Sequence, residues 1–250
     1  MSSSPKECRL YGDFSWLWPV ISPPEAHAQE SEILSGTIRE YSKTHVRTLL
    51  HLGCGGGHND CTFKKHFTVT GTDISENMLE LARKLNPEAT YCRGDMRRVR
   101  LDATFDSVVA LDSMNYMLTV EDLRAVFATA FYHLNPGGVF LTLIEQTAKT
   151  FPQNWTSCSI HSRDDMEVAF IENLYDPDPS DTVYEATLLF LVRRKGKLDI
   201  FSDRHTCGIF ETDTWLRSAT ETGFEFYRES LFLPDEDPTT YPLLVCVKPA

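Results

Sequence analysis

The sequence predicts an α/β fold: a doubly wound, mostly parallel sheet of seven strands, with an antiparallel β insert after the fifth strand. Five short apolar runs alternate with helical patterns before residue 146, namely 46–52, 67–71, 90–92, 105–111 and 139–144. Runs that are apolar on both faces are typical of parallel strands covered by helices on two sides. Beyond residue 146 the rhythm changes to strand-like segments joined by short turns, which predicts the insert.

The helices and strands follow from local patterns. Helices are expected at 24–43, 59–66, 75–85, 119–134 and 212–222. Ser75 and Thr119 are the expected N-caps, because a hydroxyl can accept a hydrogen bond from a free backbone N–H of the first helical turn. Asn-Pro-Gly-Gly at 135–138 is expected to separate a helix from the fifth strand. The insert strands are expected at 166–175, 182–194 and 198–208, and the closing strands at 224–228 and 243–247.

We expect one domain over residues 1–250, made of four parts. They are an aromatic N-terminal lid and helix at 1–45, a ligand-binding core at 46–146, the β insert at 147–210, and a closing helix with strands at 211–250. Tyr11, Phe14, Trp16 and Trp18 make the first part too aromatic for a free tail, so it must pack on the rest of the chain.

The composition limits the classes of partner that the protein can bind. The chain has 42% hydrophobic and 24% charged residues, which is typical of a folded globule. A formal net charge of −12 leaves no basic face for a phosphate backbone, so we expect no nucleic-acid partner. No apolar stretch approaches the roughly 20 residues of a membrane span and no signal segment is evident, so we expect a cytoplasmic protein without membrane contact.

The seven cysteines are odd in number and scattered, without a C-x-x-C pair. This pattern indicates neither a disulfide framework nor a zinc site. We therefore expect reduced, mostly buried thiols and no bound metal.

A glycine-rich turn closes the first predicted strand, where Gly53, Gly55 and Gly57 would let a ligand approach the backbone. A dinucleotide fingerprint needs glycine at the sixth position of this turn, and that position holds His58, which disfavours a nicotinamide cofactor. Asp73 ends the second strand, 20 positions after Gly53 (73 − 53), and can accept hydrogen bonds from two ribose hydroxyls. These residues predict an adenosine-like ligand whose anionic end is not a pyrophosphate.

Four segments together resemble the ordered motifs of class I S-adenosylmethionine-dependent methyltransferases. They are Gly53-x-Gly55-x-Gly57, Thr72-Asp73-Ile74-Ser75, Gly94-Asp95-Met96-Arg97 and Leu134-Asn-Pro-Gly-Gly138. The resemblance covers about residues 46–145. It implies a Rossmann-like methyltransferase fold, S-adenosylmethionine as cofactor and S-adenosylhomocysteine as product.

The resemblance also implies a cofactor site. The glycine turn with Cys54 would receive the methionine end of the cofactor, and Asp73, beside Ile74, would bind the ribose diol. Asp95 would bind the adenine amino group, and the backbone of Met96 would bind the edge of the ring. Leu111 and Asp112 match the stretch beside the sulfonium and the acceptor, and Tyr11 is expected in a lid over the sulfonium, whose charge is attracted to aromatic faces.

A second resemblance concerns the acceptor. The aromatic N-terminal segment and the stretch 203–210, Asp-Arg-His-Thr-Cys-Gly-Ile-Phe, are similar to amino-sugar N,N-dimethyltransferases. This implies a small acceptor. Our hypothesis is that the acceptor is a polar molecule methylated on nitrogen or oxygen, with His205 or Tyr116 as candidate catalytic residues that orient it. His161 and Glu145 are further candidates. The antiparallel strands of the insert have exposed edges, so they could pair two subunits in a homodimer.

One position departs from the resemblance. The family usually carries Asp or Glu two residues before the first glycine, where the carboxylate helps to hold the cofactor's amino group, and this chain has His51. A neutral imidazole can accept a hydrogen bond but lacks the charge, so another acid would have to supply it. His51 therefore leaves a non-catalytic cofactor-binding protein as an alternative to the enzyme. A nicotinamide-dependent oxidoreductase is a less favoured alternative, because His58 holds the last glycine position.

Overall fold

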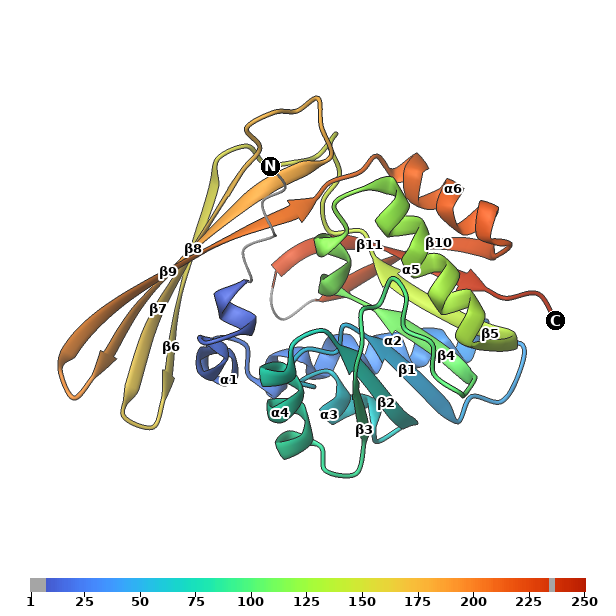
Figure 1. Ribbon diagram of the computed structural model, residues 1–250, viewed down its shortest axis with the longest axis horizontal. Helices are drawn as coiled ribbons and strands as arrows, with labels where there is room; N and C mark the ends of the chain where they lie inside the picture. The colour runs from blue at the N-terminus through green and yellow to red at the C-terminus, as the bar shows by residue number, and fades with distance from the viewer. Residues whose placement is uncertain (1–7, 234–236) are drawn as a thin grey trace.

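A computed structural model describes residues 8–233 and 237–250, which form two β-sheets with helices packed on them (Figure 1). The larger sheet has seven strands in the order β10-β11-β5-β4-β1-β2-β3. The pairs among β1 to β5 are parallel, while β11 pairs antiparallel with both β5 and β10. The strand order reverses between β4 and β1. The predicted doubly wound, mostly parallel sheet with an antiparallel insert is confirmed.

The elements of the larger sheet and its helices alternate along the chain. The strands are β1 (Thr48–Leu52), β2 (Thr68–Asp73), β3 (Thr90–Arg93), β4 (Phe105–Ala110), β5 (Leu134–Leu143), β10 (Glu225–Leu233) and β11 (Asp237–Val247). The helices are α1 (Trp18–Ile21), α2 (Ala28–Tyr41), α3 (Asp60–Phe63), α4 (Glu76–Leu85), α5 (Val120–His133) and α6 (Thr212–Thr222). Short 3-10 turns are η1 (Arg9–Tyr11), η2 (Ser15–Leu17), η3 (Pro24–His27) and η4 (Asp112–Tyr116).

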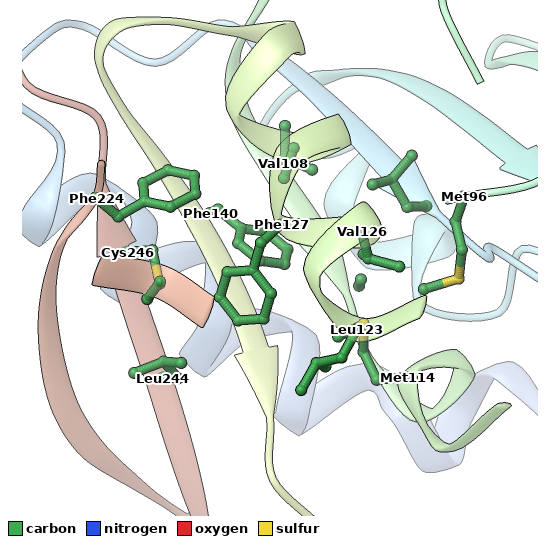
Figure 2. Close-up of a cluster of buried hydrophobic side chains, with 14 of the residues drawn as sticks. Met96, Val108, Met114, Leu123, Val126, Phe127, Phe140, Phe224, Leu244 and Cys246 are labelled. Carbon is green, nitrogen blue, oxygen red and sulfur yellow. The ribbon is translucent and has the colours of Figure 1, made fainter. Parts of the chain in front are cut away.

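Helices bury both faces of the larger sheet. On one face, α5 and α6 pack against the sheet, and the ring of Phe127 meets Phe140 and Phe224 in a fully buried aromatic cluster (Figure 2). On the other face, Leu34 and Ile38 of α2 pack against the opposite side of the same strands. Burial on both sides explains why the central strands are apolar throughout.

The two predicted N-caps are confirmed. The hydroxyl of Ser75 accepts a hydrogen bond from the backbone N–H of Met78, and that of Thr119 accepts one from Asp122. Each cap removes one unsatisfied donor from a helix start. They fix where the two helices begin: α4 directly after the carboxyl end of β2, and α5 after β4 and the short turn η4.

The predicted element boundaries need three corrections. α3 has only one turn, at Asp60–Phe63, where a helix was expected over 59–66. β5 begins at Leu134 and not at Val139, because the Asn-Pro-Gly-Gly segment itself pairs irregularly with β4. The two closing strands are longer than expected, at Glu225–Leu233 and Asp237–Val247.

The insert is a separate sheet of four strands, one more than predicted. Its strands, in spatial order, are β6 (Trp155–Arg163), β7 (Met166–Tyr175), β8 (Val183–Arg194) and β9 (Lys197–Gly208). β6 was not predicted from the sequence, because this edge strand is largely exposed on both faces and has no apolar alternation. The sheet projects from the body at the left of Figure 1.

The N-terminal segment fills the angle between the two sheets. Phe14 and Leu17 are buried against the inner face of the four-stranded sheet, which supplies Leu188 and Phe190 to the same cluster. The expectation that this aromatic segment packs is therefore met for residues 8 onward, while residues 1–7 lie outside the described residues. No helix in the described part of the chain is long and apolar enough to cross a membrane.

Candidate active site

The glycine turn at the end of β1 is held against β2. The backbone N–H groups of Gly53 and Cys54 both donate to the carbonyl oxygen of Thr72, at 2.7 and 2.9 Å. Gly53 has φ of +69°, and a Cβ atom there would lie 2.3 Å from the Ser113 hydroxyl. Only glycine fits this backbone and this space. The turn therefore brings the ends of β1, β2 and β4 together beside the point where the strand order reverses, which is where open α/β sheets bind ligands.

Asp73 lies at the carboxyl end of β2 and stabilises the turn. Its two carboxylate oxygens accept hydrogen bonds from the backbone N–H groups of Gly55, at 2.9 Å, and Ser75, at 2.8 Å. Burial raises the pKa of this carboxyl, and the backbone hydrogen bonds oppose that rise. Each oxygen keeps a lone pair, and the neighbouring Ile74 side chain is 59% exposed. A carboxylate beside an exposed apolar side chain fits a ribose diol with an attached base, so the implied cofactor suits these residues.

Asp95 follows β3, as predicted, but its carboxylate forms a salt bridge with Arg97. The Arg97 guanidinium donates Nε to Oδ1 at 2.9 Å and Nη2 to Oδ2 at 2.8 Å. Burial of Asp95 raises its pKa, but these bonds outweigh it and the pKa is lowered. An adenine amino group would have to share this carboxylate with Arg97. The predicted neighbours Met96 and Leu111 are both buried.

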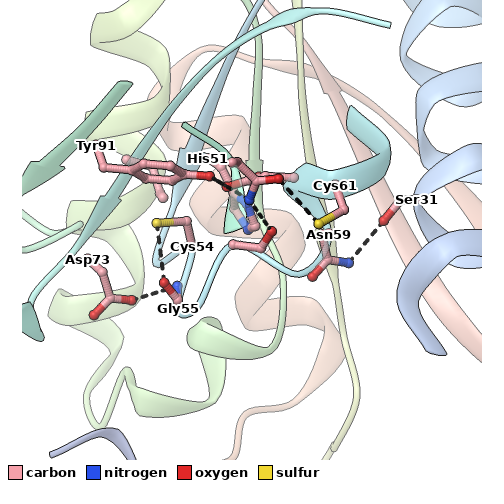
Figure 3. A network of polar contacts seen from close by, with 12 residues as sticks. Ser31, His51, Cys54, Gly55, Asn59, Cys61, Asp73 and Tyr91 are labelled. Carbon is pink, nitrogen blue, oxygen red and sulfur yellow. Dashed lines mark hydrogen bonds and ion pairs between the residues drawn. The ribbon is translucent and has the colours of Figure 1, made fainter. Parts of the chain in front are cut away.

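His51 and Cys54 point into the protein on one side of the glycine turn. The Nδ1 atom of His51 lies 2.8 Å from Oδ1 of Asp60, and Tyr91 donates its hydroxyl to the other oxygen of the same carboxylate at 2.8 Å. Burial raises the pKa of the Cys54 thiol well above its ordinary value, which makes it a poor nucleophile. Figure 3 shows this network of polar contacts, with Asp73 reaching Gly55 at the left.

The N-terminal segment is fastened beside Asp73. The Ser75 hydroxyl donates to the carbonyl oxygen of Tyr11, and the Asn77 amide donates to that of Gly12 at 2.7 Å. The rings of Tyr11 and Trp18 meet edge to face at 5.6 Å. Both belong to a layer above the carboxyl ends of the strands, which is where a lid would lie. Trp16 instead packs on Phe201 of the four-stranded sheet.

The structure brings the two candidate catalytic residues together. The Tyr116 hydroxyl lies 2.7 Å from Nδ1 of His205 and donates to the Tyr11 hydroxyl at 2.9 Å. On its other side, Nε2 of His205 lies 2.8 Å from Oδ2 of Asp203, which also accepts the backbone N–H of Leu10 at 2.7 Å. These four side chains come from η1, η4 and β9 and form one continuous hydrogen-bonded chain.

The charge state of His205 determines which atom is the donor in each hydrogen bond of that chain. Burial lowers the pKa of His205, but hydrogen bonds to Asp203 and Cys8 outweigh it and raise the pKa to about 9. The imidazole is therefore protonated at neutral pH, and both ring nitrogens donate. Nδ1–H donates to the Tyr116 oxygen, so the Tyr116 hydrogen points to Tyr11, whose own hydroxyl hydrogen remains available. This favours a positioning role for His205 over that of a proton acceptor.

Three acidic side chains lie near this hydrogen-bonded chain. Asp112 and Glu145, at the ends of β4 and β5, are hydrogen-bonded to each other, and Asn115 donates to Glu145 at 2.8 Å. Burial and the Asp112 charge raise the pKa of Glu145 well above its ordinary value, so the two carboxyl groups do not both ionise readily. Desolvation by neighbouring protein atoms and the charge of Glu30 raise the pKa of Asp112, whose side chain remains accessible to solvent. Burial also raises the pKa of Glu172 on β7, and His205 opposes that rise.

Sequence reasoning missed several residues of this site and included one that lies elsewhere. Asp60 and Glu172 had no signal beyond being single acids, and Asp203 was part of the 203–210 stretch but was not singled out, since these roles depend on contacts distant in sequence. His161 pairs with Val168 of β7, whereas His205 lies in the row of Leu174. Six residues along a strand are about 20 Å, so His161 does not join the other candidates.

Comparisons with known proteins identify the family. A family model described as a methyltransferase domain matches residues 49–138. A relative from Streptomyces venezuelae, dTDP-3-amino-3,4,6-trideoxy-alpha-D-glucopyranose N,N-dimethyltransferase, is 32% identical over 200 residues, which cover 79% of this chain and 83% of that protein.

Solved structures agree with this assignment. The crystal structure of DesVI from Streptomyces venezuelae matches with a TM-score of 0.81 at 29% identity, covering 95% of this chain and 96% of that one. The S-adenosylmethionine-bound structure of CalS10, an amino pentose methyltransferase from Micromonospora echinaspora, matches with a TM-score of 0.78 at 22% identity over 99% of this chain and all of that one, which supports the fold alone. The chain therefore belongs to the class I S-adenosylmethionine-dependent methyltransferases, is related to the sugar N,N-dimethyltransferases, and takes S-adenosylmethionine as its methyl donor.

Proposed function

We propose that the acceptor is the amino group of a small polar molecule, an amino sugar in particular. The observation that carries this proposal is the group of acidic side chains near the Tyr11–Tyr116–His205 chain, namely Asp112, Glu145 and Glu172. Most amines arrive as ammonium ions at neutral pH, and carboxylates attract them. A neutral hydroxyl acceptor would gain nothing from that charge. The N,N-dimethyltransferase activity in the name of the 32% identical relative supports the same choice.

The residues of the chain have two tasks in this proposal. S-adenosylmethionine supplies, when bound, a methyl group on a sulfonium that a nitrogen lone pair can displace directly. An ammonium has no lone pair, so its proton must leave first. Asp112 is suited to accept that proton, because its raised pKa makes its carboxylate a stronger base than an ordinary one. His205 cannot accept it at neutral pH, because it is already protonated.

The second task is orientation. The Asp203–His205–Tyr116–Tyr11 chain fixes both phenol rings, and burial raises their pKa values, so the hydroxyls stay neutral hydrogen-bond donors. Holding donor and acceptor atoms about 3 Å apart in line is worth up to roughly 7–11 kcal/mol in well-oriented systems. In a direct displacement, this positioning and the exclusion of water are the main contributions of the protein.

The acceptor is tested with a matched pair of substrates. The protein is incubated with S-adenosylmethionine and either a dTDP-linked 3-amino sugar or the same sugar with a hydroxyl in place of the amine. We expect S-adenosylhomocysteine and a product one or two methyl groups heavier with the amine only. Equal turnover of the hydroxyl compound would overturn the choice of nitrogen.

The roles of the hydrogen-bonded chain are tested by mutation. His205→Ala and Tyr116→Phe should each lower kcat for the amine acceptor at saturating cofactor by about tenfold or more, because a residue that only positions still controls the attack geometry. Tyr132→Phe is the matched control, since Tyr132 is 55% exposed on α5. If both site variants kept the turnover of the wild type, these two residues would have no role in the reaction.

We also propose that the protein is a homodimer, with the outer face of the four-stranded sheet as the interface. Ile160, Leu189 and Ile200 are exposed on this face at 72%, 37% and 64%. The four strands, about 4.8 Å apart and 9 to 12 residues long, present about 700 Å², which is close to the roughly 800 Å² that each partner buries in an interface of standard size. Light scattering should give twice the chain mass for the wild type and one chain mass for Ile160→Lys with Ile200→Lys. A wild-type monomer would refute this.

A further inference from the structure

The charge that position 51 lacks is present nearby, on Asp60. The Asp60 side chain is fully buried and that of His51 is 3% exposed, and their Oδ1 and Nδ1 atoms lie 2.8 Å apart. Tyr91 donates its hydroxyl to Oδ2 of Asp60 at 2.8 Å. A carboxylate only accepts, so Nδ1 of His51 must carry the hydrogen of the first bond. Asp60 is thus a buried acid whose two oxygens are both held by donors.

The strand register explains how these residues meet. His51 of β1 lies opposite Gly71 of β2, which lies opposite Tyr91 of β3, so all three share one face of the sheet. A Cβ atom on Gly71 would stand 2.6 Å from the Tyr91 ring. Glycine at the middle position therefore lets the ring lie across β2 towards Asp60 at the start of α3. The arrangement belongs to this sheet and not to a flexible loop.

The same network reaches the glycine turn. The Asn86 side-chain amide donates to the carbonyl oxygen of Gly57 at 2.8 Å and to the Tyr91 hydroxyl at 3.1 Å. His51 itself lies two residues before Gly53, whose backbone N–H donates to the carbonyl oxygen of Thr72, the residue before Asp73. The pair therefore lies beside the turn that is expected to receive the methionine end of the cofactor.

The second ring nitrogen of His51, Nε2, has a different environment from Nδ1. Nε2 of His51 makes no hydrogen bond to any of the described residues. It is also absent from the unpartnered polar atoms that are sealed in protein, which in the described part of the chain are on His58, Thr72 and Trp215. Nε2 therefore reaches space that protein atoms do not fill. With the hydrogen on Nδ1, this nitrogen presents a lone pair, which is an acceptor.

We infer that Nε2 of His51 accepts a hydrogen bond from the α-ammonium of bound S-adenosylmethionine, and that Asp60 is the positioning residue behind it. Asp60 cannot touch the cofactor, because it is fully buried. It holds the imidazole in the tautomer that accepts and supplies the negative charge that faces the ammonium through the ring. This inference rests on the cofactor and not on the acceptor, so it stands or falls independently of the proposed amine substrate.

The experiment compares two ligands that differ only at the methionine end. Calorimetry measures binding of S-adenosylhomocysteine, which has the amino acid, and of 5′-methylthioadenosine, which lacks it. For Asp60→Asn, an isosteric change, we expect S-adenosylhomocysteine to bind about tenfold or more weakly, as for a lost hydrogen bond to a charged group. Binding of 5′-methylthioadenosine should stay within about twofold of the wild type.

Two further variants separate this role from a structural one. Tyr91→Phe removes the other hydrogen bond of Asp60 and leaves His51 in place, so it should leave the preference for S-adenosylhomocysteine over 5′-methylthioadenosine unchanged. The double variant His51→Asp with Asp60→Asn moves the acid to the strand and should restore S-adenosylhomocysteine affinity to within about threefold of the wild type. If Asp60→Asn fails to fold, His51→Asn replaces it with the same expectation. Equal losses for both ligands, or unchanged S-adenosylhomocysteine affinity, would overturn the inference.

Discussion

The most direct test of the candidate site is the pH dependence of folding stability that His205 imposes. Its imidazole is 3% exposed and bonded to Asp203 and Tyr116, and its pKa is raised to about 9. A group whose pKa is higher in the folded state stabilises the fold when protonated. This stabilisation is fully present below pH 6.5, the ordinary pKa of histidine, and is lost as the pH rises through 9.

The magnitude follows from the two pKa values. The pKa rises from 6.5 to about 9, and each unit corresponds to about 1.4 kcal/mol, so the free energy of unfolding should lose about 3 kcal/mol between pH 6 and pH 10 through this group. Because the side chain is buried, solvent screening does not reduce this figure much. About 3 kcal/mol is a large part of the 5–15 kcal/mol that holds a typical domain together.

The assay is urea unfolding of the wild type and of His205→Gln at several pH values from 6 to 10. Other groups also titrate in this range, so the quantity of interest is the difference between the two proteins, which should shrink by about 3 kcal/mol as the pH rises. His45→Gln is the matched control, because His45 is exposed, and its difference from the wild type should not change. A constant difference for His205→Gln would mean that the imidazole is neutral at pH 7 and that the direction assigned to the hydrogen-bonded chain is wrong.

Three further predictions concern the frame of the site. Phe127→Ala should lower the free energy of unfolding by about 3–5 kcal/mol in urea, because this fully buried ring packs edge-on against three others, and a loss under 1 kcal/mol would contradict the described core. Gly53→Ala should abolish S-adenosylhomocysteine binding in calorimetry, since its Cβ would strike Ser113. Gly55→Ala has a similar backbone strain but meets only one side-chain atom at 3.5 Å, so its loss should be smaller. Ser75→Ala should cost about 1 kcal/mol as a lost N-cap and should also speed proteolysis of the N-terminal segment that its hydroxyl holds, which unchanged cleavage rates would exclude.

The sequence predicts those elements of the fold whose signals are local. α6 begins and ends where expected, at Thr212–Thr222, because Gly223 adopts φ of +99° and ends it. β7 also matches, since its apolar residues are bounded by clear turns. β6 gives no such signal: an edge strand exposed on both faces is specified by its pairing with β7, which no local pattern records.

The candidate site divides in the same way. Gly53 and Asp73 can be found from the sequence, because a turn at a strand end and an acid at the next strand end are short-range patterns. Their hydrogen bonds join neighbouring strands. His205 and Tyr116 could be named from the sequence only as candidates, and their meeting at 2.7 Å joins positions 89 residues apart. The bond between Leu10 and Asp203 spans 193 residues, and only the packing of the N-terminal segment on β9 brings them together.

The cofactor half and the acceptor half of the site are formed by different elements of the fold. The cofactor half of the site is fixed by the parallel sheet, whose register places His51, Gly71 and Tyr91 side by side on three neighbouring strands. The acceptor half is assembled from η1, η4 and β9, which meet that sheet through few hydrogen bonds, such as those from Ser75 and Asn77 to the N-terminal segment. Substitutions on the inner face of the four-stranded sheet, at Glu172 for example, can therefore change the acceptor without disturbing the cofactor. We expect the affinity for S-adenosylhomocysteine to be insensitive to Glu172→Gln while the discrimination between amine and hydroxyl acceptors falls, and a parallel loss of both would show that the two halves are not independent.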